Sequence, residues 1–341
     1  PDDVHKLLLN QLRVPFITNL DAFSKILESQ TNFRPFGDLI HSYTVEKENC
    51  RREFNVYKTE TAGEEFVNFF DKIQSFAPWF IDAATFLETE DEKWIYYTIF
   101  EKCKIETNLR FDFVGYAAVY KYYAYPEHIR PRVGHILVLP PFRRWGHGVQ
   151  LLQSIYADLI KDPAVVDITA EDPSENFVHL RDFLDAFNCS QLASFQKENL
   201  VNGFSKEMAA EAQTRLKLSK RQARRVYEIL RLKHTDCSDQ EAFKNYRLDV
   251  KKRLYLPFKK NQNDFAKLSK VLNPEELTAT LANFTPDQIK SQLEIQYQST
   301  VEDYRYTLNR LATHGAVGTL TPVALPVANG AVSGASVANG H

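Results

Sequence analysis

The stretch Arg143-Arg144-Trp145-Gly146-His147-Gly148 decides the fold of this chain. It follows an apolar run, residues 133–139, that predicts a β-strand, and it opens a run, residues 149–160, that predicts a helix. Glycine lets the backbone pass close to a ligand, and the first N–H groups of a helix have no partner inside that helix. Together with the helix dipole, these groups predict an anion-binding site between strand and helix.

The sequence on both sides of this loop alternates between strand and helix patterns. Residues 94–100 and 111–125 are rich in aromatic and β-branched side chains and predict two strands, with Gly115 as a candidate bulge. Residues 165–170 predict another strand and residues 177–187 a further helix. Strands joined by helical crossovers predict an α/β (α+β) fold with a mixed central sheet.

The two ends of the chain carry helix signals. Residues 21–28, with Asn19 or Asp21 as the cap, and residues 64–75, ended by Pro78, predict two early helices. From about Leu192 onward the pattern is helical throughout. Its start signals are the capping boxes Ser219/Gln222, Ser238/Glu241 and Thr285/Gln288, and Pro274 and Pro286 at first helical positions. Residues 315–341 contain no Asp, Glu, Lys or Arg, which indicates a disordered tail or linker.

Composition narrows the function classes. A chain of 341 residues is long enough for two domains, or for one domain and a helical extension. The net charge of -2 argues against a general nucleic-acid binder. Residues 1–101 hold 18 acidic and 10 basic side chains, which suits a cationic substrate or simply a solvated surface. No apolar run reaches the length of a membrane span.

The cysteines and the start of the chain carry further expectations. The four cysteines match no zinc spacing, so reduced thiols are expected, with Cys189 structural and in a strand or loop. The chain starts at Pro1 and its only methionine is Met208, so we expect part of the natural N-terminal region to be missing. We expect no secretory signal.

The loop resembles a known signature. Its spacing is similar to the Arg/Gln-x-x-Gly-x-Gly/Ala pattern by which GCN5-related N-acetyltransferases hold the pyrophosphate of acetyl-coenzyme A. Four further blocks resemble the type B histone acetyltransferase catalytic subunit family more specifically, and the match runs from about residue 5 to about residue 313. These blocks are Phe33–Gly37, Arg130–Val133, Asp167–Ser174 and Gln222–Arg231.

The resemblance implies a division of the chain and an activity. Residues 1–80 would be part of an N-terminal substrate-binding region, and residues 81–190 the acetyltransferase core with the acetyl-coenzyme A site. Residues 191–313 would be a helical C-terminal domain, and residues 314–341 a disordered tail. The implied activity is acetyl transfer to lysines in the N-terminal tail of newly made histone H4, with histone 2A as a further candidate.

Carboxylates are needed because a free lysine has a pKa of about 10.4 and must lose a proton before it attacks a thioester. Glu171 and Asp172 follow a predicted strand at the edge where open α/β sheets bind ligands. By the resemblance Glu171 matches the proposed base, while Asp172 and Asp82 are secondary candidates. A turn that only ends the strand and caps the next helix is the plain alternative.

The resemblance also implies contacts with acetyl-coenzyme A. Ile136, Leu137 and Val138 match the strand whose backbone pairs with the pantetheine arm, and one of their N–H groups would polarise the acetyl carbonyl. The pyrophosphate loop comprises Arg143, Arg144, Trp145, Gly146, His147, Gly148 and Val149, acting through backbone more than side chains. Asn176 matches a further contact. Phe177 stands beside it, in a helix where many of these enzymes carry a tyrosine acid, so the thiolate is expected to take its proton from solvent.

For the histone tail, the resemblance implies a groove lined by Trp94, Tyr120, Lys121 and Tyr122, although aromatic strand residues are more often core. The acidic run Glu88, Glu90, Asp91 and Glu92 would attract a basic tail or form a solvated turn. The basic residues Arg221, Arg224, Arg225 and Arg231 would pack in the fold, contact a partner or meet cofactor phosphate.

The implied mechanism is direct attack in a ternary complex, without a metal and without a covalent cysteine intermediate. The implied partners are histone H4 with H3 and a WD40-repeat histone chaperone of the retinoblastoma-binding type, with no direct contact to nucleic acid or membrane. Cytoplasm and nucleus are the expected locations. Two alternatives remain: an acetyltransferase for another amine, and a catalytically weak histone-binding module.

Overall fold

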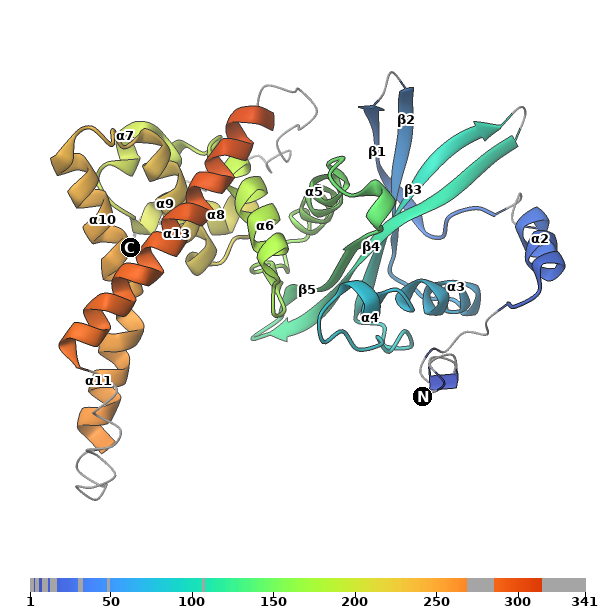
Figure 1. Cartoon of the computed structure of the whole chain (residues 1–341), viewed down its shortest axis with the longest axis horizontal. Helices are drawn as coiled ribbons and strands as arrows, with labels where there is room; N and C mark the ends of the chain where they lie inside the picture. The colour runs from blue at the N-terminus through green and yellow to red at the C-terminus, as the bar shows by residue number, and fades with distance from the viewer. Residues whose placement is uncertain are drawn as a thin grey trace, which may run out of the picture.

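A computed structural model describes residues 3, 6–7, 12, 17–29, 33–47, 50–105, 108–268 and 285–314. These residues form a twisted six-stranded sheet with helices on it, and a group of C-terminal helices stands beside one edge of the sheet (Figure 1). In this part of the chain no helix combines the length and apolar character that crossing a membrane requires.

The sheet is mixed, as predicted. Its strands lie in chain order, antiparallel from the first to the fifth, and the last pairs in parallel with the fifth. They are β1 (Asp38–Lys47), β2 (Cys50–Thr59), β3 (Trp94–Ile105), β4 (Asn108–Ala124), β5 (His128–Val138) and β6 (Thr169–Ala170). The first two strands were not predicted from the sequence, yet they belong to the same sheet as the others.

The strand predicted at residues 165–170 is largely wrong, because only the two residues of β6 pair continuously with β5. An isolated pair joins Val165 to Ile129, and the next pair joins Thr169 to Arg132, so four steps along this segment oppose three along β5 and one extra residue interrupts the strand. The Ile168 N–H donates to the carbonyl oxygen of Lys217 at 2.8 Å, and the Arg181 guanidinium donates to the Ile168 carbonyl at 2.7 Å. The C-terminal helices thus bind the outer backbone groups of this segment.

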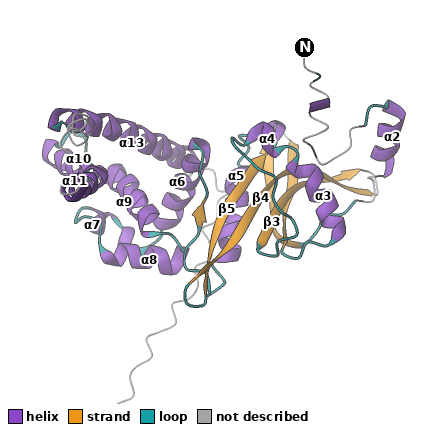
Figure 2. Ribbon diagram, turned by 90° about the horizontal axis from the view of Figure 1, so that it is seen from below, coloured by secondary structure: helices purple, strands orange, loops and turns teal. Residues whose placement is uncertain are grey.

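Helices cover both faces of the sheet (Figure 2). The helix α3 (Glu64–Gln74) packs Phe66, Phe70 and Ile73 on one face, and the short α4 (Ala77–Phe80) follows it. The other face is covered by α5 (His147–Leu159) and α6 (Glu175–Cys189), in the largest apolar core of the described residues. The helix predicted at residues 64–75 is confirmed, and Pro78 lies in the first turn of α4.

The candidate bulge in β4 is displaced by one residue. The pairing with β3 shifts between Ile99 and Phe100, which leaves Val114 as the extra residue beside Gly115. Gly115 serves a different purpose, because a Cβ atom there would lie 2.4 Å from the Leu137 carbonyl oxygen. Glycine at this position therefore allows β4 and β5 to approach closely at the end of β5, just before the glycine loop.

The C-terminal region is helical in its described part, as predicted. Short 3-10 turns occur at Pro140–Phe142 and Ala193–Phe195. The helices are α7 (Lys197–Leu200), α8 (Lys206–Leu216), α9 (Lys220–His234), α10 (Gln240–Leu254), α11 (Leu256–Leu268) and α13 (Pro286–His314). Near the other end, α2 (Leu20–Ser29) is capped by Asn19, whose side-chain oxygen accepts from the N–H groups of Asp21 and Ala22.

Two of the three predicted capping boxes are placed correctly. The Ser219 hydroxyl accepts from the Gln222 N–H, and Thr285 and Gln288 bond each other reciprocally. At α10 the cap is Asp239, not Ser238, because the Asp239 carboxylate accepts from two N–H groups of the first turn. Pro286 is the first residue of α13, whereas Pro274 and residues 315–341 lie outside the described residues.

All four thiols are free, as predicted. Cys189 is fully buried, and burial raises the pKa of its thiol well above the usual value, which supports a structural role. It ends α6, so the predicted strand or loop at this position is wrong.

Three of the basic residues of α9 are paired inside the fold. Arg224 binds the carboxylates of Glu228 and Asp249, Arg225 binds Asp182 of α6, and Arg231 binds Asp249. Only Arg221 of the four predicted residues is exposed to solvent. Packing in the fold is thus the interpretation that holds for the other three.

Candidate functional site

The glycine loop places backbone donors at the start of α5. Arg144 and Gly146 have φ values of 65° and 90°, and Gly146 is the N-cap of the helix without a side-chain hydrogen bond. The first N–H of the helix with a backbone partner is that of Val149, which donates to the Gly146 oxygen at 3.0 Å. Within the described residues the N–H groups from Trp145 to Gly148 have no such partner, so the predicted anion site has the donors it needs.

The side chains of the loop are engaged with the fold. The Arg143 Nε atom donates to the Val138 carbonyl at 2.9 Å, and its guanidinium lies over the Phe80 ring. The Lys47 ammonium lies 4.0 Å from the centroid of the Trp145 ring. The His147 side chain is buried. These contacts agree with the expectation that the loop meets phosphate chiefly through its backbone.

Next to this loop, the last residues of β5 have no neighbouring strand on one side. The Leu139 N–H donates to Val114 of β4, so by alternation the N–H of Leu137 also faces β4 while those of Ile136 and Val138 face away. On that side β6 has already ended, since its last pair joins Ala170 to the earlier part of β5. Of the three predicted residues, Ile136 and Val138 can therefore offer an N–H to a ligand, and Leu137 cannot.

The three candidate acids are exposed, and two of them lie where this opening begins. Glu171 follows β6 directly, and its N–H donates to the Val133 carbonyl at 3.0 Å, which fixes its backbone where the two strands part. Asp172 is the next residue, with a φ of 30°. Asp82 lies in the turn after α4 and precedes Ala83, which has a φ of 55°. Within the described residues none of the three carboxylates has a hydrogen bond or ion pair.

Left-handed backbone conformations occur next to the candidate acids and in the glycine loop. The described non-glycine residues with positive φ are Ala83, Arg144, Asp172 and Lys217. Three of them adjoin a candidate acid or lie in the glycine loop. Left-handed backbone costs about 1–2 kcal/mol at a non-glycine residue, and such strain is typical of functional sites.

Asn176 and Phe177 occupy the first turn of α6. The Ser174 hydroxyl accepts from the Phe177 N–H at 3.3 Å and so caps the helix. Asn176 is exposed, which leaves its amide available to a ligand, whereas the Phe177 ring is buried. The described position of Phe177 therefore supplies no acid for a leaving group.

The predicted groove residues form an aromatic row across β3 and β4. The rings of Trp94 and Tyr120 meet edge to face at 4.9 Å, and Tyr120 and Tyr122 lie 4.6 Å apart. Arg132 of β5 lies over the Tyr122 ring, which is 37% exposed. Trp94 is half-buried and packs against the core beneath α3, Tyr120 is half-buried and Tyr122 is exposed, while Lys121 alternates to the opposite face of β4.

One acid of the predicted run is part of this row. The Tyr120 hydroxyl donates to the Asp91 carboxylate at 2.9 Å. The Lys93 N–H, and after it this hydroxyl, hold the pKa of Asp91 below its usual value. Glu88, Glu90 and Glu92 are exposed. The end of the row is therefore negatively charged at neutral pH.

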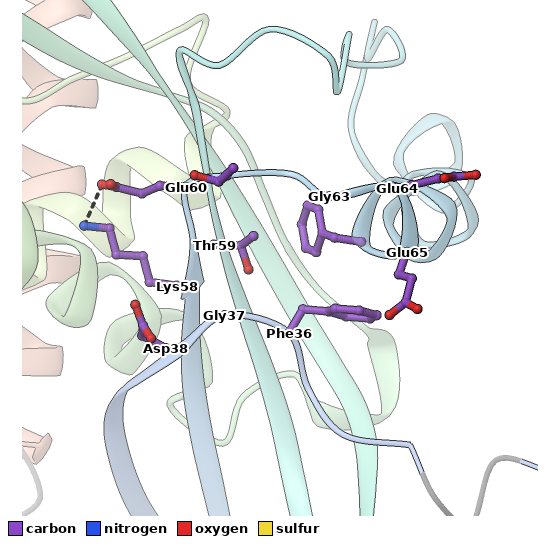
Figure 3. A pocket seen from close by; sticks show the side chains of 11 residues that line it. Phe36, Gly37, Asp38, Lys58, Thr59, Glu60, Gly63, Glu64 and Glu65 are labelled. Atoms are coloured by element: carbon purple, nitrogen blue, oxygen red, sulfur yellow. Dashed lines mark ion pairs between the residues drawn. The ribbon is translucent and has the colours of Figure 1, made fainter.

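A separate hollow of about 610 Å³ lies where β1 begins and β2 ends (Figure 3). Its lining includes Phe36, Asp38, Lys58 and the first turn of α3. Lys58 is paired with Glu60, also in the lining, and with Asp158 of α5. None of the residues predicted for acetyl transfer lines this hollow.

Comparison with known proteins decides the family. The chain matches the model "Histone acetyl transferase HAT1 N-terminus" over residues 1–82 and "Histone acetyltransferase type B catalytic subunit, C-terminal" over residues 181–232. It is 44% identical over 313 residues to the histone acetyltransferase type B catalytic subunit of Mus musculus, covering 91% of this chain and 75% of that protein. The Homo sapiens protein is 43% identical over the same shares. The chain belongs to the histone acetyltransferase type B catalytic subunit family.

A histone acetyltransferase of this family transfers acetyl from acetyl-coenzyme A, so the predicted family, fold class and enzyme class are confirmed. A Dictyostelium discoideum family member is 32% identical over 268 residues, 75% of this chain and 54% of that protein. A solved aminoglycoside acetyltransferase from an uncultured soil sample overlaps 37% of this chain and 82% of its own, at 12% identity and a TM-score of 0.28. A likeness of that size adds nothing to the family assignment.

The sequence interpretation overlooked one set of residues in this acetyltransferase. Tyr43 of β1 contacts His147 at the start of α5, and His41 contacts Gln150. The short alternation Ser42-Tyr43-Thr44-Val45 is a strand signal that could have placed Tyr43 on one face.

Proposed function

We propose that this enzyme acetylates lysines in the N-terminal tail of newly made histone H4, with histone 2A as a further substrate. The observation that carries the proposal is the opening between β5 and β6. It has two N–H groups on one side, an exposed carboxylate at its start and a donor-rich loop at its end. An extended acyl carrier with a charged pyrophosphate suits that arrangement.

In the proposed mechanism both substrates are bound together. Glu171, or a water held by it, takes the proton from the lysine ammonium, and the neutral amine attacks the thioester carbonyl. The N–H of Ile136 or Val138 stabilises the negative charge that develops on the carbonyl oxygen. The carbon–sulfur bond then breaks, and the nitrogen releases its extra proton to solvent as the amide forms. The thiolate takes its proton from solvent because Phe177 cannot donate one. The step uses no metal and no cysteine.

The aromatic row gives the proposed tail groove its chemistry. Trp94, Tyr120 and Tyr122 offer aromatic surface to the side chains of a tail, and Arg132 and Lys93 already lie over the rings of Tyr122 and Tyr120. Asp91 with the exposed glutamates beside it adds negative charge. A basic tail segment fits such a surface. A small amine with a single charge would contact less of this surface than a tail with several basic residues, which favours the tail.

We further propose histone H3–H4 and a WD40-repeat chaperone of the retinoblastoma-binding type as partners, and cytoplasm and nucleus as locations. Membership of the family supports both proposals. Copurification of the tagged full-length protein with such a chaperone, and imaging of that protein in cells, would test them. Recovery without the chaperone would contradict the first.

The decisive experiment measures acetyl transfer to an H4 tail peptide by the unaltered protein and by Glu171→Gln across pH. Loss of a positioned base is expected to lower the rate about 10²- to 10⁴-fold while coenzyme A affinity is kept. The matched variants Asp172→Asn and Asp82→Asn remove one exposed carboxylate each and should cost far less. An unchanged rate in Glu171→Gln, with loss in one of these variants, would move the base to that residue.

A peptide competition separates the substrate proposals. The H4 tail peptide should compete with itself and lose affinity when its lysines and arginines are replaced by glutamine. If a peptide with a free N-terminal amine and no lysine were acetylated equally fast, the enzyme would be an acetyltransferase for another amine. If neither peptide were acetylated in a single turnover while both bound, the binding-module alternative would hold.

A further inference from the structure

The outer hairpin of the sheet reaches the pyrophosphate loop through one buried contact. The Tyr43 hydroxyl of β1 lies 2.6 Å from Nδ1 of His147, the first residue of α5. Phe54 of β2 lies against the imidazole, with ring centroids 4.3 Å apart, and stacks on Tyr43. The imidazole is thus enclosed by rings and held by one hydroxyl.

This contact persists in its neutral form near pH 7. Burial, followed by the nearby charge of Arg52, lowers the pKa of His147 to about 4, and burial raises the pKa of Tyr43 far above its usual value. Neither side chain changes charge in the physiological range. The His147 Nε2 atom is buried without a partner among the described residues, so the Tyr43 hydroxyl is the fixed polar contact of the ring.

The contact acts at a helix start that has no capping side chain. Gly146 caps α5 without a side-chain hydrogen bond, and an added Cβ there would find no atom within 4 Å. One turn further on, His41 Nε2 lies 2.9 Å from the Gln150 side-chain oxygen, so β1 contacts the first turn of α5 twice. The direction of the loop N–H groups therefore depends on how β1 holds the helix start.

We propose that Tyr43 is a positioning residue for acetyl-coenzyme A, because its hydroxyl fixes His147 and with it the backbone N–H groups that meet the pyrophosphate. Tyr43 itself touches neither substrate. Its loss turns the donors away from the anion and weakens coenzyme binding, while the carboxylate and the tail groove keep their geometry. This inference rests on the assignment of the pyrophosphate loop under the proposed function.

The test is Tyr43→Phe, which removes the hydroxyl and keeps the ring. The KM for acetyl-coenzyme A is expected to rise about tenfold, as is the Kd for coenzyme A in a calorimetric titration, with kcat and the KM for the H4 peptide within twofold of the unaltered protein. The matched control is Tyr57→Phe on β2, whose hydroxyl accepts from Asn55 and makes no described contact with α5. It should leave all four constants unchanged.

A purely structural role would give a different result. Tyr43→Phe would then lower the melting temperature and the active fraction, yet the KM for acetyl-coenzyme A of the remaining enzyme would be unaltered, and the proposal would be wrong. If Tyr43→Phe does not fold, His147→Phe removes the nitrogen acceptor from the other side and keeps a ring against Phe54. The same tenfold change is expected, and an unchanged KM overturns the proposal.

A third variant separates this inference from the loop assignment. Gly146→Glu places a Cβ and a negative charge at a residue with a φ of 90°. If Gly146→Glu leaves coenzyme A affinity intact, the loop is not the pyrophosphate site and both proposals fail. If Gly146→Glu abolishes binding while Tyr43→Phe does not change it, only the role of Tyr43 is wrong.

Discussion

Carboxylates serve opposite purposes in the opening of the sheet and in the C-terminal helices. Glu228 of α9 is fully buried and accepts hydrogen bonds from Arg224, Arg253 and Tyr304. Glu171 is exposed where β5 and β6 part, and the described residues give it no ion pair or hydrogen bond. A buried carboxylate is stable only when every oxygen is paired, whereas a base must keep its lone pairs for substrate.

The pairing of basic residues follows the same division. Arg224 and Arg253 pair with the buried Glu228, and Arg225 pairs with the buried Asp182. The acids of the sheet region have fewer such partners and leave a negative surface near Trp94. An excess of charge in a sequence segment therefore predicts a charged region. The ion pairs seen in the structure show whether those charges serve stability or binding.

The same substitution, glutamate to glutamine, should have its largest and most different effects at Glu228 and at Glu171. Glu228→Gln leaves arginines facing an uncharged amide, and breaking a buried ion pair costs about 3–5 kcal/mol of unfolding free energy. Chemical denaturation measures that loss. Activity per folded molecule should stay unchanged, whereas Glu171→Gln should lose activity and keep stability. If Glu228→Gln lowers kcat without changing stability, the assignment of Glu228 to stability and of Glu171 to activity is wrong.

The buried imidazole of His147 makes the free energy of unfolding depend on pH. Its pKa in the folded protein is about 4, below the value of about 6.5 in the unfolded chain. The unfolded state therefore binds the proton first, and stability falls as pH decreases from about 6.5 to 4, by about 3 kcal/mol in total. Denaturation of the unaltered protein minus that of His147→Phe isolates this term.

The subtraction is needed because another group opposes it. Burial raises the pKa of Asp185 to about 6, so its contribution to stability increases as pH falls through that value. Both proteins contain Asp185, and the difference removes it. A flat difference curve would show that His147 is not buried in its neutral form.

The two glycines of the loop offer a matched pair with a smaller effect. Gly146→Ala puts a side chain at a φ of 90°, which costs about 1–2 kcal/mol and should raise the KM for acetyl-coenzyme A several-fold. Gly148→Ala adds a Cβ in ordinary contact with Leu180, 3.4 Å away, and should be close to neutral. Equal effects in the two variants would contradict the idea that backbone direction matters at Gly146.

The smallest expected effect concerns the tail groove. Tyr120→Phe removes the hydrogen bond to Asp91, worth about 0.5–1.5 kcal/mol, and should raise the KM for the H4 peptide about two- to tenfold. Tyr123→Phe is the control, because its hydroxyl donates only to the nearby Pro126 carbonyl. If the KM for acetyl-coenzyme A changed instead, Tyr120 would belong to the coenzyme site and not to the tail groove.

Local signals in the sequence predicted much of the fold. Residues 64–75, the cap at Asn19 and the loop at Gly146 follow from nearest-neighbour chemistry, and the structure confirms them. The length of β6 could not be predicted in this way. An extra residue between Val165 and Thr169 interrupts the pairing with β5, and the apolar pattern of residues 165–170 does not reveal it.

The candidate site divides in the same way. The glycine spacing and Glu171 were visible as local patterns, while the availability of Ile136 and Val138, but not Leu137, depends on strand pairing. Tyr43 was missed because its partner, His147, is 104 positions away and neither residue stands out in its own segment. Contacts of that kind require the folded chain.

The contact of Ile168 with Lys217 and Arg181 gives the C-terminal helices a second task. They hold the backbone just before β6, three residues ahead of Glu171. An acetyltransferase core cut away after α6 would keep Glu171, Gly146 and the open edge of β5, yet lose the Lys217 carbonyl that binds Ile168. Such a fragment would retain every reactive group while one of the two anchors of the segment that leads to Glu171 was gone.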